Sequence, residues 1–313
     1  MSAQRAGIVW NPSKVTKEEL LSALGESTEV ELSWHETTED DPGRGAAQAA
    51  VEAGAEVVLA AGGDGTVRAV AEYLADANSA AELAVIPLGT GNLLARNLGI
   101  PLNNLTAAFE RAFAGESQPL DIGWAEVQLA DRTERAAFAV MAGFGIDAHM
   151  ITETNDDLKD KAGWLAYVES LGRALDASEV IDVRLSTGEA AAKSEAAHTL
   201  IIGNCGTLQG GITLLPDADP GDGELDLLVL SADSFAGWAD TARNLVWDNG
   251  LKRLFGGNNA ETAAQSSDSA SHRRFTNLVM ELAEPRVFEV DGDVIGESSH
   301  VSVSIQAAAV RVR

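Results

Sequence analysis

The sequence predicts an α/β protein in which an N-terminal doubly wound domain is followed by a C-terminal β-sandwich domain. Apolar runs alternate with helical patterns up to about residue 114, which is typical of a mostly parallel sheet. Beyond that point short strands follow one another with few helices between them, as in a β-sandwich. Gly, Ser and Pro cluster between residues 115 and 120, so we divide the chain into domains 1–118 and 119–313.

The first domain is expected to contain four strands that alternate with helices. Residues 6–10 are continuously apolar and residues 30–34 alternate between apolar and polar, and both patterns are typical of strands. Thr16 and the pair Pro42–Gly43 each precede a helical pattern. The other expected strands are 57–62 and 83–86, and the other expected helices are 66–74 and 105–114.

The second domain is expected to consist mainly of strands. We expect strands at 121–127, 136–141, 180–185, 199–203, 211–215 and 225–230, helices near 159–175 and 235–254, and a flexible loop at 256–271. The helix near 235–254 combines apolar residues at helical spacing with Arg243, Lys252 and Arg253. This mixture suits a helix at a membrane surface, although such a stripe also suits packing on the sandwich.

Composition limits the classes of partner and location. The 313 residues carry a formal net charge of -26, and the sequence pI is about 4.4, so phosphate backbones are repelled and no nucleic-acid partner is expected. No apolar run approaches the roughly 18 to 20 residues of a spanning helix and no signal-peptide pattern is present, so we expect a cytoplasmic protein. The single cysteine, Cys205, excludes an internal disulfide, and the five histidines show no metal-ligand spacing.

Two glycine-rich stretches carry the chemistry of the first domain. Gly62-Gly63-Asp64-Gly65-Thr66 and Pro87-Leu88-Gly89-Thr90-Gly91-Asn92 each follow an apolar strand and open into a helical sequence. Each stretch alone suits an ordinary tight turn, but together they suit a phosphate site, because amides at a helix N-terminus attract anions. Asp64 repels phosphate unless a cation intervenes, which points to Mg²⁺ with a nucleoside triphosphate.

The two stretches in this order, with Arg68 and Asn92 where they stand, resemble the diacylglycerol kinase catalytic domain family, which includes bacterial lipid kinases and sphingosine kinases. The resemblance extends over almost the whole chain. In the second domain it rests on segments 142–147, 163–167, 203–204, 210–211 and 216–226, and the main unmatched insertion is 256–271. It implies ATP as phosphoryl donor and a lipid acceptor.

The resemblance also implies roles for individual residues around the nucleotide. Asn11 matches the family's Asn-Pro turn beside the nucleotide, although Asn is also an ordinary turn former. Thr38 resembles a threonine that contacts the nucleotide, and Thr37 is nearly as good a match. The phosphates would be wrapped by Gly62, Gly63, Asp64, Gly65, Thr66 and Arg68, with Thr90 and Asn92 as further donors.

A second cation site is expected in the acidic turn of residues 216–226. A carboxylate among free carbonyls suits a hard cation, and in related kinases this segment holds a structural Mg²⁺. Here the ligands would be the Asp222 side chain with Asp219 and Glu224 supplying carbonyls. The alternative is a surface turn that is acidic because the whole protein is acidic.

The catalytic base is expected near the C-terminus. Lipid kinases of the bacterial type have Asp-Gly-Glu there, whereas this sequence has Asp291-Gly292-Asp293. An aspartate can accept the hydroxyl proton if it comes within hydrogen-bond reach, although its shorter stem shifts the carboxylate by roughly one C–C bond and can slow the transfer. Asp293 is therefore the candidate base, and Asp291 and Glu297 are substitutes. Asp293 also suits a plain turn.

These observations favour an ATP-dependent lipid kinase that phosphorylates the primary hydroxyl of a diacylglycerol or sphingoid lipid. Peripheral contact with the inner face of the membrane follows from a lipid substrate, and a homodimer is left open. A kinase of the NAD kinase type shares the Gly-Gly-Asp-Gly-Thr loop, and a nucleotide-binding regulator without transfer activity is the alternative that Asp293 raises. A dinucleotide oxidoreductase is disfavoured, because Asn11-Pro12 stands where its glycine motif belongs.

Overall fold

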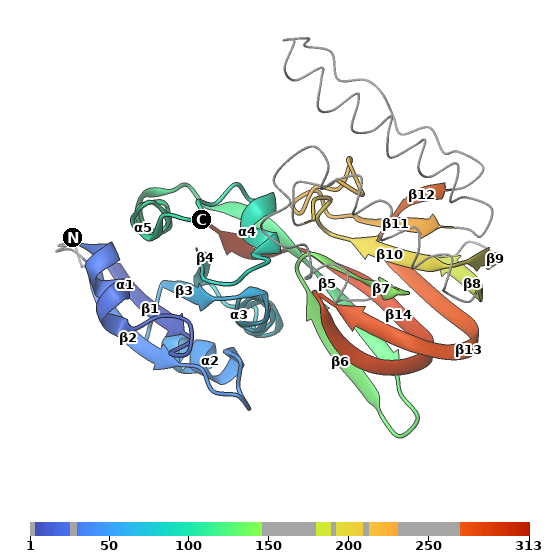
Figure 1. The fold of residues 1–313 in the computed structure, drawn as a ribbon, viewed down its shortest axis with the longest axis horizontal. Helices are drawn as coiled ribbons and strands as arrows, with labels where there is room; N and C mark the ends of the chain where they lie inside the picture. Colours follow the sequence, from blue (N-terminus) through green and yellow to red (C-terminus); the bar gives the residue numbers. More distant parts are fainter. Residues whose placement is uncertain (1–3, 26–29, 146–179, 189–191, 209–212, 231–269) are drawn as a thin grey trace, which may run out of the picture.

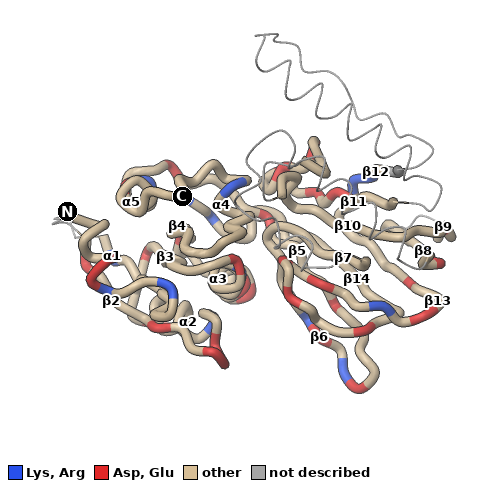
Figure 2. Tube along the Cα trace, viewed as in Figure 1, with Lys and Arg blue, Asp and Glu red and all other residues tan. Residues whose placement is uncertain are grey.

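A computed structural model describes residues 4–25, 30–145, 180–188, 192–208, 213–230 and 270–313 (Figure 1). The described chain forms two domains, and their strands belong to one continuous network of hydrogen-bonded ladders. Acidic positions are spread over both domains (Figure 2). Among the described residues, no helix combines the length and the apolar character needed to cross a membrane.

The first domain is built on four parallel strands in the order β4-β3-β1-β2. β1 is central because β2 pairs with one of its edges and β3 with the other, so the chain changes direction between β1 and β3. In such a sheet the ligand site lies beyond the carboxyl ends of the strands at this point. The elements are β1 (Gln4–Trp10), α1 (Lys17–Leu24), β2 (Val30–Glu36), α2 (Arg44–Glu52), β3 (Val57–Gly62), α3 (Asp64–Asp76), β4 (Glu82–Pro87), α4 (Leu93–Asn97) and α5 (Leu105–Ala114).

Helices cover both faces of this parallel sheet, as the sequence predicts for a doubly wound fold. Side chains of a strand point alternately to its two faces, and Val9 therefore packs with α2 and α3 while Ile8 packs with α1 and α5. Alternate residues of β3 divide in the same way between the two cores. Burial on both faces explains why β3 reads as one continuous apolar run.

The second domain is made of antiparallel strands around a large apolar core, and a smaller apolar cluster of Ile201, Leu215, Leu228 and Leu230 packs on the outer side of β10 and β11. Phe138, Phe144 and Phe288 are fully buried at the centre of the large core, and the rings of Phe144 and Phe288 lie 4.9 Å apart edge to face. Inner faces of strands that pack on one another in this way form a β-sandwich core. The strands are β5 (Gln118–Gln128), β6 (Thr133–Phe138), β7 (Met141–Phe144), β8 (Ile181–Thr187), β9 (Lys193–Ala197), β10 (Thr199–Gly203), β11 (Leu225–Leu230), β12 (Ala270–Phe275), β13 (Asn277–Val290) and β14 (Asp293–Val312).

The end of the chain returns to the first domain. β14 pairs with β13 and β5 over most of its length, and its last part also reaches β4, where Val312 lies beside Leu83 (Figure 1). Arg313 forms an ion pair with Glu82 of β4 and donates to the Ala112 carbonyl of α5 at 3.1 Å. The division at residue 118 stays a prediction, and residues 310–313 stabilise the first domain although they belong to the second segment.

Several expected elements differ from those in the structure. The expected strand 136–141 is two strands, β6 and β7, with a break at Ala139 and Val140. Residues 213–215 of the expected strand 211–215 form only an isolated bridge from Thr213 to Thr207. The hairpin of β13 and β14 was missed, and residues 270 and 271 of the expected loop belong to β12. The helices near 159–175 and 235–254 lie outside the described residues.

Candidate active site

The two glycine-rich loops lie side by side at the carboxyl ends of β3 and β4. The Leu88 N–H donates to the Gly62 carbonyl at 2.9 Å, and a Cβ on Gly89 would stand only 2.7 Å from the Gly63 Cα. The backbones approach so closely that only glycine fits at this contact. Gly63 is also the N-cap residue of α3, and it has no side chain that could cap the helix. The N–H groups in the first turn of α3 are therefore available to donate hydrogen bonds to an anion.

Asp64 joins the two loops through its carboxylate. Its Oδ2 accepts from the Asn92 N–H at 2.7 Å and its Oδ1 accepts from the Leu93 N–H at 2.6 Å, at the start of α4. Burial raises the pKa of this carboxyl, and the two N–H groups partly offset the increase. Each oxygen keeps a second lone pair, so the donor set is compatible with Mg²⁺ that arrives with a triphosphate, which is how Mg²⁺ is usually held.

The other residues of the second loop hold its shape. Asn92 has φ 47°, its Oδ1 accepts from the Gly89 N–H at 2.9 Å, and its Nδ2 donates to the Gly89 carbonyl at 2.6 Å. Thr90 is exposed at the tip of the loop, whereas Thr66 is buried and packs close to Gly62. Thr90 is therefore accessible to a ligand, and the buried Asn92 side chain braces the loop.

Asn11 and Thr38 follow β1 and β2 at the same edge of the sheet, and both close turns in the structure. The Asn11 Oδ1 accepts from the Ser13 N–H at 2.9 Å, and the Thr38 Oγ accepts from the Asp41 N–H at 3.0 Å. Thr37 is buried and donates its N–H to the Trp10 carbonyl, whereas Thr38 is exposed. The exposed Thr38 is the better placed of the two for a ligand, and their nucleotide contacts stay predictions.

Asp293 lies beside the first glycine loop although it is more than 200 positions away in sequence. Its Oδ2 accepts from the Arg68 Nη2 at 2.5 Å, and a Cβ on Gly65 would stand 4.0 Å from the same oxygen. The carboxylate is 56% exposed. Of the predicted site residues, Gly65, Arg68 and Asp293 are thus brought together from both domains around one exposed carboxylate.

Asp291 has a structural role that the sequence did not predict, because its carboxylate binds the backbone of residues 139–141. With φ 48° it forms a two-residue turn with Gly292 between β13 and β14. Its Oδ1 accepts from the Val140 and Met141 N–H groups at 2.9 Å, and its Oδ2 accepts from the Ala139 N–H at 2.8 Å. These bonds take the amides of residues 139–141 out of the sheet, which explains the break between β6 and β7.

The environment of Asp291 also makes it a poorer candidate for the catalytic base than Asp293. Burial of the carboxylate raises its pKa to about 6, an effect that the three amides and the charge of Arg68 partly offset. Because both oxygens are turned onto the backbone of residues 139–141, they do not face a substrate. The exposed Asp293 is therefore the better placed base. An Asp-Gly pair after an apolar run is a strong hairpin signal, and it was available in the sequence.

The acidic turn of residues 219–224 pairs with an arginine. Arg274 of β12 contacts the Asp222 carboxylate through Nη2 and lies 3.1 Å from a Glu224 carboxylate oxygen through Nη1. The second Asp222 oxygen accepts from the Glu224 N–H at 3.0 Å. Among the described residues, no group of three or more acidic, His or Cys side chains is arranged for a metal ion. A structural cation here stays a prediction, and it would have to displace a guanidinium.

Asp121 anchors this turn to the junction of the two domains. It is 1% exposed, and its two oxygens accept from the Gly223 N–H at 2.7 Å and the Ala308 N–H at 2.6 Å. Its backbone N–H donates to the Pro220 carbonyl. Asp121 therefore fixes the position of the turn through the chain itself.

Comparisons with known proteins agree with this arrangement. Residues 10–125 match the diacylglycerol kinase catalytic domain, and residues 140–312 match the YegS C-terminal NAD kinase beta sandwich-like domain. The chain is 30% identical over 314 residues to a protein of Pseudomonas aeruginosa named probable lipid kinase YegS-like, with 100% of this chain and 95% of that protein covered. It is also 30% identical to a diacylglycerol kinase of Bacillus subtilis over 74% of each chain.

A solved structure shares the fold. The crystal structure of a diacylglycerol kinase from Bacillus anthracis superposes with a TM-score of 0.65 at 19% identity, covering 99% of this chain and 96% of that one. The family matches span both described domains, including the glycine loops and the turn that carries Asp293. The chain belongs to the family of kinases that combine a diacylglycerol kinase catalytic domain with a YegS-type C-terminal domain.

Proposed function

We propose that this protein transfers the γ-phosphoryl group of ATP to the primary hydroxyl of a diacylglycerol or a related sphingoid lipid. The observation that carries the proposal is the position of Asp293, an exposed carboxylate from the second domain that lies beside Gly65 in the phosphate loop of the first. A base and a donor site that meet at one point suit a transfer between two bound substrates.

In this reaction the two glycine loops bind the donor, and Asp293 accepts the proton of the acceptor. The first-turn amides of α3 and the loop that ends at Asn92 hold and orient the phosphates. Asp293 accepts the hydroxyl proton while the lipid oxygen forms a bond to the γ-phosphorus and the bond between this phosphorus and the β,γ-bridging oxygen breaks, so that ADP leaves. Mg²⁺, held by Asp64 and the phosphates, would neutralise charge on the donor.

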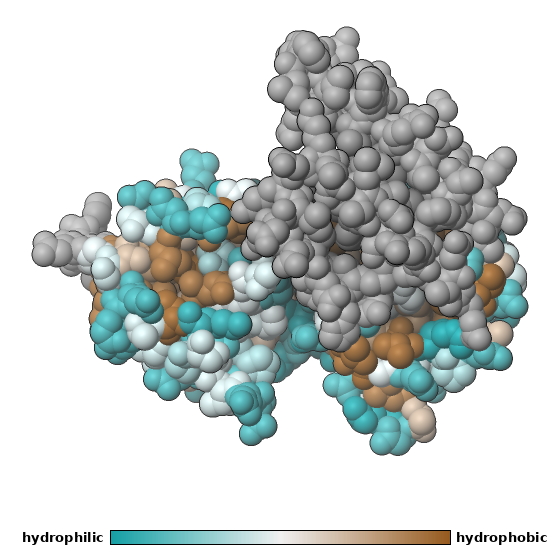
Figure 3. Space-filling view, viewed as in Figure 1, coloured by the Kyte–Doolittle hydropathy of each residue, from teal (hydrophilic) through white to brown (hydrophobic). Residues whose placement is uncertain are grey.

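A lipid acceptor also agrees with the surface around the base. Val294, the residue after Asp293, is 62% exposed, and Val287 of the same hairpin is 41% exposed. Hydrophobic residues reach the surface on both domains in the view of Figure 3. Exposed apolar side chains on the hairpin that carries the base suit contact with acyl chains, so we also propose peripheral contact with a lipid surface.

The test is a transfer assay with γ-labelled ATP, Mg²⁺ and separate acceptors: diacylglycerol in mixed micelles, a sphingoid base, and NAD. We expect label on a lipid, and no label on any acceptor with Asp293→Asn. Label on NAD alone would favour a kinase of the NAD kinase type instead. If ATP binds and no acceptor is labelled, the protein is better described as a nucleotide-binding regulator.

A further inference from the structure

Arg68 links the two halves of the candidate site. It lies in α3, one turn after Asp64, so both side chains are on the same side of the helix. Its Nη2 donates to the Asp293 Oδ2 at 2.5 Å across 225 positions of sequence. The Arg68 side chain is 16% exposed and the Asp293 side chain is 56% exposed, so Asp293 is the more accessible member of the ion pair.

The ion pair leaves part of the guanidinium unused. The Arg68 Nε is buried and has no hydrogen-bond partner among the described residues. Asp291 lies close enough for the Arg68 charge to influence its pKa, but its oxygens are held by the amides of residues 139–141. Arg68 is thus a cation beside the first glycine loop, and among the described residues its ion-pair partner is the candidate base, Asp293.

A nucleoside triphosphate competes with Asp293 for this guanidinium. Arginine binds phosphate through two parallel N–H donors, and such charged hydrogen bonds are about twice as strong as neutral ones. A triphosphate in the glycine loops carries several negative charges, whereas Asp293 carries one. When the donor is absent, Asp293 balances the charge of Arg68 and one of its oxygens is occupied by Nη2.

We propose that Arg68 exchanges Asp293 for the phosphates when the nucleotide binds, and that this exchange frees Asp293 to accept the lipid proton. The proposal rests on the proposed function, and it adds that the nucleotide binds before Asp293 accepts the proton of the lipid hydroxyl. The Oδ2 atom of the base is released only when the donor is in place, which couples the two domains through one side chain. Arg68 then has two roles, one toward the donor and one as a positioning residue for Asp293.

The exchange makes a prediction about nucleotide affinity in the absence of any lipid. If nucleotide binding must first break the ion pair, then Asp293→Asn removes the competitor and tightens binding. An ion pair of this exposure is worth about 1 kcal/mol or less, so we expect the dissociation constant to fall about 3- to 5-fold. Arg68→Gln is expected to weaken binding, and Arg68→Lys is expected to recover part of it.

The experiment is a double-mutant cycle by calorimetry with a non-hydrolysable ATP analogue and Mg²⁺. It compares the parent protein, Asp293→Asn, Arg68→Gln and the double variant, with thermal melts to confirm folding. Glu72→Gln is the matched control, because Glu72 lies in the same helix and loses the same charge but pairs with Arg44 at 2.9 Å. We expect Asp293→Asn to tighten binding more in the Arg68 background than in the Arg68→Gln background, and Glu72→Gln to change it less.

Two outcomes would overturn the proposal in different ways. Simple repulsion between Asp293 and the phosphates acts at least as strongly without Arg68, so an equal or larger effect of Asp293→Asn in the Arg68→Gln background would overturn the exchange alone. If the parent protein does not bind the analogue at all, the proposed function fails first and the exchange fails with it.

Discussion

The Asp64 carboxylate accepts a hydrogen bond of 2.7 Å from the Asn92 N–H and thereby ties the first glycine loop to the second. The Leu93 N–H donates to its other oxygen at 2.6 Å, so Asp64 caps the N-terminus of α4 from a different element. The residue that the sequence singles out as a partner of Mg²⁺ therefore also holds the two glycine-rich loops together.

We expect Asp64→Asn to lose phosphoryl transfer and also to lower the free energy of unfolding. An amide in either orientation turns its NH₂ toward one of the two backbone N–H groups, which costs about 1 to 3 kcal/mol. Asn104→Ala is the control, because Asn104 caps α5 by accepting from the Ala107 N–H at 3.0 Å. It should cost about 1 kcal/mol and leave nucleotide binding unchanged.

The measurements are urea denaturation and calorimetric binding of an ATP analogue with each variant. Loss of affinity in Asp64→Asn beyond that in Asn104→Ala assigns Asp64 to the nucleotide site. Near-normal turnover of Asp64→Asn would contradict its role toward Mg²⁺, and an unchanged free energy of unfolding would contradict its role in tying the two loops together.

The sequence identifies the local features of this protein well. The strand 199–203 and the strand 225–230 have the expected bounds, and α3 covers the expected helix 66–74 with two more residues at each end. Each of these carries its own signal in apolar periodicity or in glycine next to a strand. The family resemblance alone implied that Gly65, Arg68 and Asp293 belong to one site, and the ion pair between Arg68 and Asp293 was not predicted.

Long-range contacts explain what the sequence analysis missed. The run 136–141 is continuously apolar and reads as one strand, but the Asp291 carboxylate, 150 positions farther on, interrupts its ladder. Nothing within the run signals this break. Similarly, the ion pair of Asp222 with Arg274 was not predicted, because the two residues lie 52 positions apart in the sequence.

Asp291 gives stability a pH dependence of known sign. Burial raises its folded-state pKa from 3.8 to about 6. Its contribution is therefore fully present below about pH 4 and is lost as the pH rises through about 6, by about 3 kcal/mol at 1.36 kcal/mol for each pKa unit. Asp291→Asn removes this titration and turns one NH₂ hydrogen toward a backbone N–H, so we expect it to be less stable at pH 4.

The measurement for Asp291 is the free energy of unfolding of both proteins between pH 4 and pH 7. We expect the difference between them to shrink as the pH rises. A difference that stays constant over this range would mean that the Asp291 carboxyl has an ordinary pKa.

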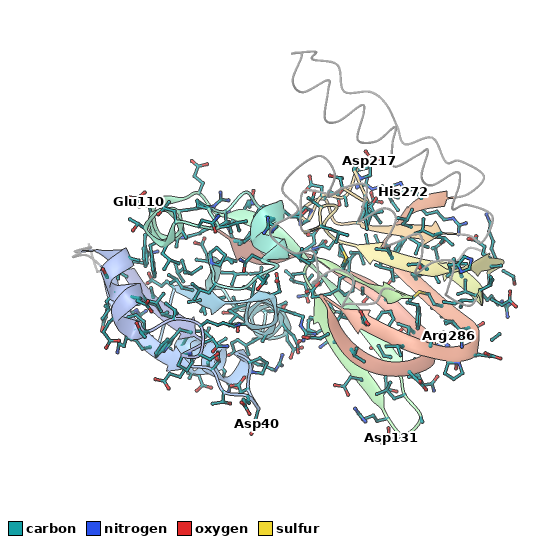
Figure 4. The ribbon with its side chains drawn as sticks, viewed as in Figure 1. Asp40, Glu110, Asp131, Asp217, His272 and Arg286 are labelled. Atoms are coloured by element: carbon teal, nitrogen blue, oxygen red, sulfur yellow. The ribbon has the colours of Figure 1, made fainter. Side chains whose placement is uncertain are left out.

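Two histidines are expected to respond to pH in opposite directions. His272 lies 2.5 Å from the buried Asp226 carboxylate and close to Asp217 (Figure 4), and the hydrogen bond to Asp226 raises its pKa. Its stabilisation is present below about pH 6.5 and is lost as the pH rises through its folded pKa. Burial lowers the pKa of His35, so its neutral form is favoured and its contribution has the opposite sign.

The test is thermal unfolding of His272→Gln and His35→Gln at pH 6 and pH 8. We expect His272→Gln to lose more stability at pH 6 than at pH 8, because the variant lacks the charged pair with Asp226 that stabilises the parent at pH 6. For His35→Gln, the loss should be smaller at pH 6 than at pH 8. Parallel shifts for the two variants would show that the Asp226 hydrogen bond does not control His272.

The next prediction concerns Mg²⁺ binding at the acidic turn, where Arg274 would compete with the cation for the Asp222 carboxylate. If Asp222 and its neighbours bind a cation, Mg²⁺ must displace the guanidinium, so its effect on the melting temperature should be larger in Arg274→Gln than in the parent. Asp222→Ala should abolish the effect, because binding to the folded state alone is what raises the melting temperature. Equal responses in all three proteins would show that this segment is only a turn.

The last prediction concerns the length of the side chain at position 293. Asp293→Glu restores the family's pattern and adds one methylene to a carboxylate that is 56% exposed, so the hairpin accommodates it without repacking. We expect this variant to keep or raise kcat, because a shift of about 1 Å toward the hydroxyl changes proton transfer more than it changes donor binding. Asp293→Asn should lose kcat through the missing base.

Lipid kinase assays of the parent and both variants at saturating ATP decide the matter. If Asp293→Asn turns over as fast as the parent, Asp293 is not the catalytic base, and the exposed Glu297 would be the next residue to test. If the parent binds ATP without phosphorylating any lipid while Asp293→Glu gains activity, then the natural aspartate has turned a kinase site into a nucleotide sensor. The Asp293 carboxylate lies beside Gly65 of the first glycine loop, and a glutamate would carry its carboxyl group about one C–C bond farther, so the difference between the two outcomes lies in the position of one carboxyl group relative to the acceptor.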